Sequence, residues 1–153
     1  MGCMMDEIDR RILHALQRDC DRSLDALAES VGLSRNAVWR RVRSLEDSGV
    51  LRQRVALVDG EKVGLALRVV ILVRTDQHTA DWSKRFAAAA RALPEILGVY
   101  RMTGDLDYLI EARVSDMADY DRLYQSLTSR IELHDVSASF VMEVLKETTV
   151  LPV

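Results

Sequence analysis

The stretch SLDALAESVGLSRNAVWRRVRSL, residues 23–45, decides the fold of the N-terminal part of the chain. Ser23 and Ser34 are of the residue type that caps helix N-termini, and Gly32 supplies a tight turn between them. Apolar residues recur at helical spacing on both sides of that turn: Leu24, Leu27, Ala28 and Val31 before it, and Val38, Val42 and Leu45 after it. Because only residues 32–34 separate the two predicted helices, the stretch predicts a helix-turn-helix unit.

A further helix is predicted upstream, over residues 6–18. Ile8, Ile12, Leu13 and Leu16 follow helical spacing, and acidic residues stand where a helix N-terminus favours negative charge. The N-terminal part is therefore expected to be a bundle of three helices.

The outward face of the helix after Ser34 carries side chains suited to DNA. Arginine can grip guanine through two acceptors and asparagine can pair with adenine, while a capped helix N-terminus can hold a phosphate. The predicted DNA-binding residues are Ser34, Arg35, Asn36, Trp39, Arg40 and Arg43. The alternative is a small helical bundle whose charged face is only solvated.

The charge distribution supports the same interpretation weakly. The chain has a net charge of −3, but residues 34–54 hold six arginines against Glu46 and Asp47. One basic patch on an acidic body can attract phosphates while limiting indiscriminate binding. Arginine-rich helix faces are also common as plain surface.

The segment over residues 51–64 predicts the boundary between two domains. Residues 51–58 alternate like a wing or linker strand, and Asp59, Gly60 and Gly64 then break regular structure. The predicted domains are residues 1–58, a linker over 59–64, and a second domain over 65–153.

The second domain is expected to be ferredoxin-like. Strands are predicted over residues 66–75, 96–102, 108–114 and 136–145, and helices over 81–92 and 117–129. The β-branched run in the first of these strands is typical of burial on both faces. The order βαββαβ is that of a split ferredoxin-like unit, and the whole chain is of the α+β class.

Composition excludes several classes of protein. The 153 residues are 48% hydrophobic, enough for packed cores, and two cysteines, Cys3 and Cys20, are too few for a disulfide framework or zinc site. No signal-peptide pattern and no run of 18 apolar residues is present, so we expect a soluble cytoplasmic protein without a membrane partner.

Five motifs together resemble the leucine-responsive regulatory protein/AsnC family, also called feast/famine regulators. They are residues 9–13 (DRRIL), 31–34 (VGLS), 41–46 (RVRSLE) with Gly49-Val50 following, 104–108 (GDLDY) and 141–143 (VME). The resemblance runs from about Asp6 to Pro152. Two departures, Asp59-Gly60 at the linker and the bulky Trp39, leave the base preference open.

The resemblance implies a transcriptional regulator that binds double-stranded DNA as a homodimer, assembling further to a tetramer or octamer. A small amino acid would bind in clefts between dimers and modulate assembly or DNA affinity. The implied ligand-binding residues are Thr103, Gly104, Asp105, Asp107, Tyr108, Ser137 and Ser139. Asp107 has an alternative role, since it can simply satisfy backbone amides. No cofactor other than the effector is expected.

A narrower resemblance concerns residues 82–86, 147–149 and 151–152, which are similar to a branch controlling amino-acid catabolism, including sulfur amino acids such as cysteine. Two alternatives are a sirohaem decarboxylase-like enzyme and an amino-acid sensor without DNA binding. His14, His78 and His134 stand in three separate segments without a nucleophile or metal arrangement, so we predict that the chain is not an enzyme.

Overall fold

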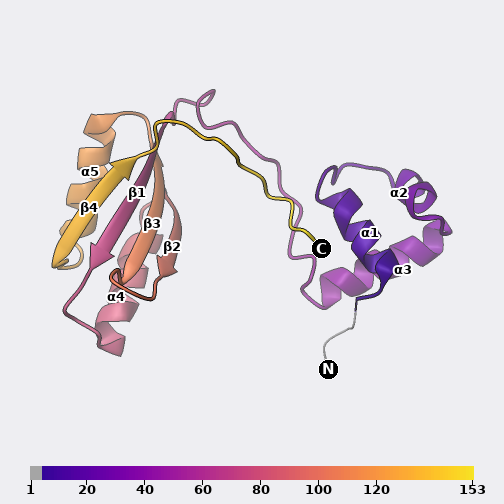
Figure 1. Cartoon of the computed structure of the whole chain (residues 1–153), viewed down its shortest axis with the longest axis horizontal. Helices are drawn as coiled ribbons and strands as arrows, with labels where there is room; N and C mark the ends of the chain where they lie inside the picture. Colours follow the sequence, from indigo (N-terminus) through magenta and orange to yellow (C-terminus); the bar gives the residue numbers. More distant parts are fainter. Residues whose placement is uncertain (1–4) are drawn as a thin grey trace. The chain divides into compact units, whose positions relative to one another are not determined.

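The computed structural model describes residues 5–153, which form two compact units (Figure 1). Of the described residues, the first unit contains 5–56 together with 146–153, and the second contains 57–145. The C-terminal residues 146–153 thus lie with the helical unit, although the sequence analysis placed them in the second domain. Cys3 lies outside the described residues.

The first unit contains three helices, α1 (Glu7–Leu16), α2 (Leu24–Val31) and α3 (Arg35–Asp47). Each begins at a side-chain cap: Asp6 accepts from the Asp9 amide at 2.9 Å, Ser23 from the Ala26 amide and Ser34 from the Ala37 amide. Gly32 ends α2 with a φ of 72°, in the left-handed region that favours glycine. The predicted helix-turn-helix is confirmed.

The core of this unit comes from the apolar stripes of all three helices. Ile12 of α1, Leu27 of α2 and Val38 of α3 are at most 1% exposed. These contacts fix the rotation of α3 about its axis. They consequently determine which of its side chains face solvent.

Residues 51–58 differ from the expected wing. They form no strand, and residues 52–58 are exposed along their whole length. Alternation alone does not make a strand when no partner supplies hydrogen bonds, and no strand within residues 5–153 pairs with this segment.

The second unit is a four-stranded antiparallel sheet with two helices on one face. Its elements, in chain order, are β1 (Leu67–Arg74), α4 (Ala80–Arg91), β2 (Ile96–Arg101), β3 (Tyr108–Val114), α5 (Met117–Thr128) and β4 (Asp135–Phe140). The strand order in the sheet is β2-β3-β1-β4. The predicted βαββαβ order and ferredoxin-like fold are confirmed.

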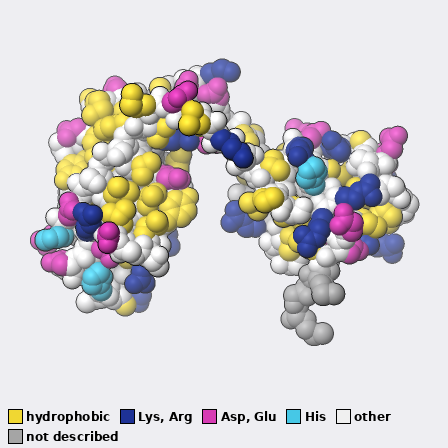
Figure 2. All heavy atoms as spheres, in the orientation of Figure 1, with side chains coloured by type: hydrophobic (Ala, Val, Ile, Leu, Met, Phe, Trp, Pro, Cys, Tyr) yellow, Lys and Arg dark blue, Asp and Glu magenta, His cyan; other side chains and the backbone are white. Residues whose placement is uncertain are grey.

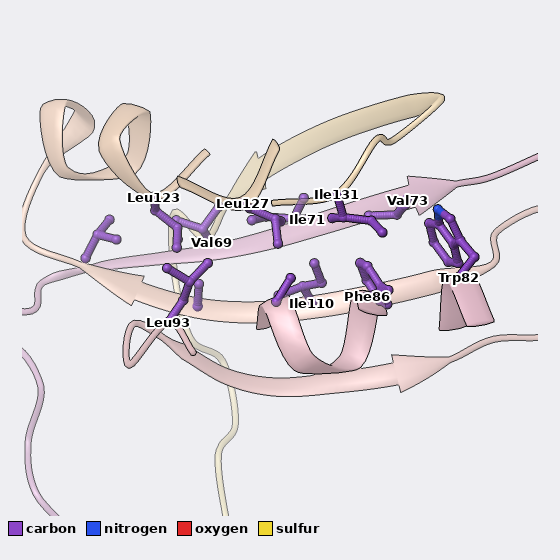
Figure 3. Close-up of a cluster of buried hydrophobic side chains, with 13 residues drawn as sticks. Val69, Ile71, Val73, Trp82, Phe86, Leu93, Ile110, Leu123, Leu127 and Ile131 are labelled. Carbon is purple, nitrogen blue, oxygen red and sulfur yellow. The ribbon is translucent and has the colours of Figure 1, made fainter. Parts of the chain in front are cut away.

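The core of this unit lies between the sheet and its helices (Figure 3). Val69, Ile71 and Val73 of β1 are fully buried against Phe86 of α4 and Leu127 of α5. The helices therefore cover the central strand β1 on this side of the sheet.

The opposite side of the sheet, which we call the open face, is not covered by α4 or α5. Val70 and Leu72 of β1 point to it and remain partly exposed. The strand expected to be buried on both faces is thus buried on one. The unpartnered apolar side chains explain why its sequence reads as continuously hydrophobic.

The end of strand β4 and the C-terminal segment complete the description of the two units. The last strand was expected to reach residue 145 but ends at Phe140. One further backbone bond follows it, from the Val141 amide to the Arg68 carbonyl at 3.0 Å. In the C-terminal segment, the Gln17 side chain pairs with the backbone of Leu151 through bonds of 2.6 and 3.2 Å. No helix among residues 5–153 is long and apolar enough to cross a membrane.

Candidate nucleic-acid interface and effector site

The outward face of α3 presents all six predicted DNA-binding residues to solvent. Val38, Val42 and Leu45 point into the core, so helical rotation turns the other side outward. We call the six exposed residues the reading face: Ser34, Arg35, Asn36, Trp39, Arg40 and Arg43. Figure 2 shows Lys and Arg side chains gathered on the visible side of this unit.

The arginines of the reading face differ in their partners. Arg35 lies 3.3 Å from the Asp25 carboxylate, and Arg43 lies 3.3 Å from that of Asp47. Arg40 makes no ion pair within residues 5–153. Exposed ion pairs of this kind are weak and exchange readily for phosphate. Arg40 is therefore the arginine of the reading face whose guanidinium no carboxylate of the described residues holds.

A fourth arginine of α3, Arg41, stabilises the fold instead. Its guanidinium lies 2.7 Å from carboxylate oxygens of both Asp6 and Asp9 at the start of α1. The Asp9 amide and this guanidinium hold the pKa of Asp6 below its ordinary value, while bonds to Asp9 and Asp6 raise the pKa of Arg41. This bridge has no local signature in the sequence, because Arg41 and its partners are more than 30 residues apart.

A small hollow of about 290 Å³ adjoins the reading face and extends it beyond α3. Leu24 and the 57%-exposed Trp39 give it apolar walls. Arg54 lines it too and pairs with Glu46 at 3.0 Å. The hollow thus joins apolar walls to a rim that carries Arg43 and Arg54 together with Glu46.

The predicted effector turn joins β2 to β3 in the second unit. Gly104 has a φ of 96°, a conformation that only glycine adopts without strain. Arg74 of β1 holds the turn: its Nε donates to the Asp105 carbonyl at 2.9 Å, and its terminal nitrogen pairs with Asp135 at 2.8 Å. Nothing in the local sequence of Arg74 signals this role. Thr103 and the Asp105 side chain remain exposed.

Asp107 supports the backbone in this structure. Its carboxylate accepts from the Thr75 amide at 2.8 Å, and its own amide donates to the Val73 carbonyl. The ring of His78 lies 3.8 Å from its second oxygen. The Asp107 carboxylate thus satisfies a backbone amide, which is the alternative role considered for it above. Among the described residues of the turn, Asp105 is the one whose carboxylate has no such partner.

The remaining predicted effector residues lie on opposite sides of the sheet. Tyr108 faces the helices, with its ring centroid 4.6 Å from that of Phe86. Ser137 and Ser139 of β4 are exposed and alternate with Val136, Ala138 and Phe140, which pack against the core. A single subunit therefore does not bring Tyr108 and the two serines together.

The histidines show no catalytic arrangement in the part of the chain that the structure describes. His14 contacts the Arg18 guanidinium on α1, His78 lies near Asp107, and His134 precedes β4. No group of three His, Cys, Asp or Glu side chains within residues 5–153 is placed to hold a metal ion. Cys20 is a free thiol.

Two family models match the chain. Residues 5–46 match the AsnC-type helix-turn-helix domain, and residues 68–151 match the Lrp/AsnC ligand binding domain. The two matches correspond to the reading face with its supporting helices and to the sheet with its turn.

Whole-chain relatives agree with these matches. The chain is 46% identical to the DNA-binding transcriptional activator DecR of Escherichia coli K12, over 98% of this chain and 99% of that one. The structure of an AsnC family transcriptional regulator from Agrobacterium tumefaciens is 44% identical, with a TM-score of 0.93 and 97% of each chain covered. A Neisseria meningitidis transcriptional regulator in complex with L-Met is 36% identical, with a TM-score of 0.92 and the same coverage.

Motifs, fold and relatives therefore converge on one assignment, which confirms the resemblance seen in the sequence: the chain belongs to the Lrp/AsnC family of DNA-binding transcriptional regulators.

Proposed function

We propose that this regulator binds a pseudo-palindromic DNA site as a homodimer, through the reading face of α3, and that a small amino acid modulates its assembly or DNA affinity. The observation that carries the proposal is the exposure of all six reading-face residues on one capped helix whose rotation the core fixes. Two such helices in a dimer would enter successive major grooves.

Within the reading face we assign distinct roles. Arg40 reads a base edge directly, since no carboxylate holds it. Arg35 and Arg43 exchange Asp25 and Asp47 for DNA. Ser34, at the N-terminus of α3, holds a phosphate with the free backbone amides of the first turn.

The open face of the sheet supports the dimer. It exposes apolar side chains of the central strands, including Val70 and Leu72, and burial against a second copy would remove them from water. Further association to a tetramer or octamer would bring the effector turns of different dimers together.

The effector is proposed to bind at the turn. The Asp105 carboxylate is free to accept from an α-ammonium group, and Gly104 lets a ligand approach the backbone closely. Thr103 and Asp107 complete the turn. Because Tyr108 and the pair Ser137 and Ser139 lie on opposite faces, a site that uses all of them requires more than one subunit.

The chemistry of the effector is narrowed by the Neisseria relative, whose structure holds L-Met. We propose a sulfur-containing amino acid, cysteine or methionine, for this chain as well. We expect no catalytic activity and no cofactor besides the effector. Since the target is chromosomal DNA, the proposed place of action is the cytoplasm.

The deciding experiment selects fragments from a random duplex pool with the purified protein. Enriched fragments are retested across salt concentrations and with each of the twenty amino acids. We expect a pseudo-palindromic site whose affinity or complex size one sulfur amino acid shifts. Weak, salt-sensitive binding without sequence preference would refute the proposal.

A further inference from the structure

A groove of about 470 Å³ lies between α4 and the edge strand β2, on the side of the sheet that the helices cover. Its floor is apolar: Phe86, Ala87 and Ala90 come from α4, and Ile96 and Val99 from β2. A volume of roughly 300–1,000 Å³ with an apolar floor and few polar groups is typical of small-molecule sites.

Polar groups converge at one end of the groove. Arg101 and Tyr108 are partners in the pairing of β2 with β3, so both side chains point to the groove side of the sheet. The Tyr108 hydroxyl lies 3.4 Å from Oγ of Ser83 on α4. This end thus offers one guanidinium and two hydroxyls.

A second cation stands toward the other end. Arg91 is the last residue of α4, eight positions after Ser83, which places it about 12 Å further along the helix axis. Neither Arg91 nor Arg101 makes an ion pair within residues 5–153. No residue lining the groove is acidic.

This charge pattern selects among ligands. A carboxylate with an apolar tail finds a cation and an apolar floor. The ammonium group of a zwitterionic amino acid finds no carboxylate among the lining residues and would lie near a guanidinium. An oxo oxygen in place of the ammonium could instead accept a hydrogen bond from either hydroxyl.

We propose that this groove is a second effector site, which binds a small 2-oxo acid with an apolar side chain. Arg101 pairs with its carboxylate, Ser83 or Tyr108 donates to its oxo oxygen, and the apolar tail lies along Ala87 and Val99. This site goes beyond the amino-acid response proposed at the Asp105 turn. At the turn, the Asp105 carboxylate would bind an ammonium group. In the groove, no lining carboxylate is present and cations disfavour an ammonium group.

The test is calorimetric titration of the full chain with 4-methyl-2-oxopentanoate, 4-methylpentanoate and L-leucine, which share an apolar tail. We expect the oxo acid to bind at least about tenfold more tightly than leucine, with the plain carboxylate between them. Arg101→Gln should weaken oxo-acid binding at least about tenfold. Arg85→Gln, on the same helix but outside the groove and paired with Asp81, should leave it unchanged.

A second variant tests the groove itself. Ala87→Trp fills it from a partly exposed position and should abolish oxo-acid binding without lowering the melting temperature. The proposal is overturned if leucine binds as tightly as the oxo acid, or if neither variant changes binding. It is also overturned if no ligand binds and Ala87→Trp instead reduces self-association, which would make the groove an interface between copies.

The two effector proposals are separated by measuring DNA binding. Asp105→Asn should weaken the amino-acid response about tenfold and leave calorimetric oxo-acid binding intact. If this variant lost both the amino-acid response and oxo-acid binding, the groove and the turn would form one site, and the proposal of a second site would be overturned. A chain that binds the oxo acid but no specific DNA would overturn only the proposed regulation.

Discussion

The two units of this regulator place their functional residues in different ways. The six reading-face residues lie within ten positions, from the N-cap Ser34 to Arg43, on one helix. The proposed effector residues come from a turn, from β3 and from β4, and they lie on both faces of a sheet. The first arrangement depends on helix rotation, the second on strand topology and on other subunits.

This difference determines where a substitution can change binding without also changing stability. Apart from Ser34, which caps α3, a reading-face side chain points to solvent and has few structural duties, so its loss should affect DNA and little else. In the second unit, Asp107 and Arg74 both support the backbone around the turn. Substitutions there mix stability with ligand response unless the residue is chosen by its contacts.

The largest expected effect concerns the core that fixes the reading face. Ile12 is fully buried, so Ile12→Ala should lower the free energy of unfolding by about 2–5 kcal/mol. Denaturant unfolding measures the loss, and hydrogen exchange should locate it in the first unit. Leu57→Ala, at a 74%-exposed position, is the control and should change stability by less than about 0.5 kcal/mol. Equal losses of hydrogen-exchange protection in both units would show that Ile12 does not stabilise the first unit alone.

Next comes the reading face itself. Arg40→Ala should weaken specific DNA binding by about 1–3 kcal/mol, because a base-reading guanidinium is lost without any change in the fold. Arg43→Ala should weaken it less, since Arg43 must first leave Asp47. Titration of labelled operator DNA measures both. Arg122→Ala, in α5 and paired with Asp119, should bind like the unaltered chain; a matching loss there would indicate general charge attraction.

How far the sequence predicts this molecule follows the same division. The caps Ser23 and Ser34, and the stripe from Val38 to Leu45, are local signals, and the structure confirms the helices they predict. The strands of the second unit were also predicted from local patterns. The helix predictions and the strand predictions both depend on the spacing of residues within a dozen positions.

What the sequence did not show depends on distant partners. The bridge from Arg41 to Asp6 and Asp9 joins residues more than 30 positions apart. Arg74 reaches the turn and Asp135 only because β1 lies between β3 and β4. Residues 51–58 alternate like a strand yet lack a partner. Such features follow from the assembled topology and have no local signature.

The turn offers a sharper version of the comparison. Asp105→Asn should weaken the amino-acid response about tenfold and leave the melting temperature unchanged, because this carboxylate is exposed and supports nothing. Asp107→Ala should impair the response while also lowering the melting temperature, since the Thr75 amide loses its acceptor. DNA binding without effector should persist in both. A response that survives both substitutions would place the effector elsewhere.

Trp39 tests whether the reading face uses apolar contacts. Replacing thymine by uracil in the operator removes only the methyl group, and we expect a loss of about threefold at the contacted position. Trp39→Ala should bind both operators equally. A uracil effect of the same size in the variant would mean that the methyl group acts through DNA shape or another residue.

The smallest effect is a pH dependence of the first unit. The folded-state pKa of Asp6 is held below its ordinary value by the Asp9 amide and by Arg41. The stabilisation is therefore present above the unfolded pKa of about 4 and is lost as the pH falls through the lower folded value. Denaturant midpoints of the unaltered chain should thus fall more steeply below pH 4 than those of Asp6→Asn, which cannot titrate there. Parallel curves would show that the Asp6 carboxylate adds no stability, and that Asp9 is the carboxylate through which α1 pairs with Arg41.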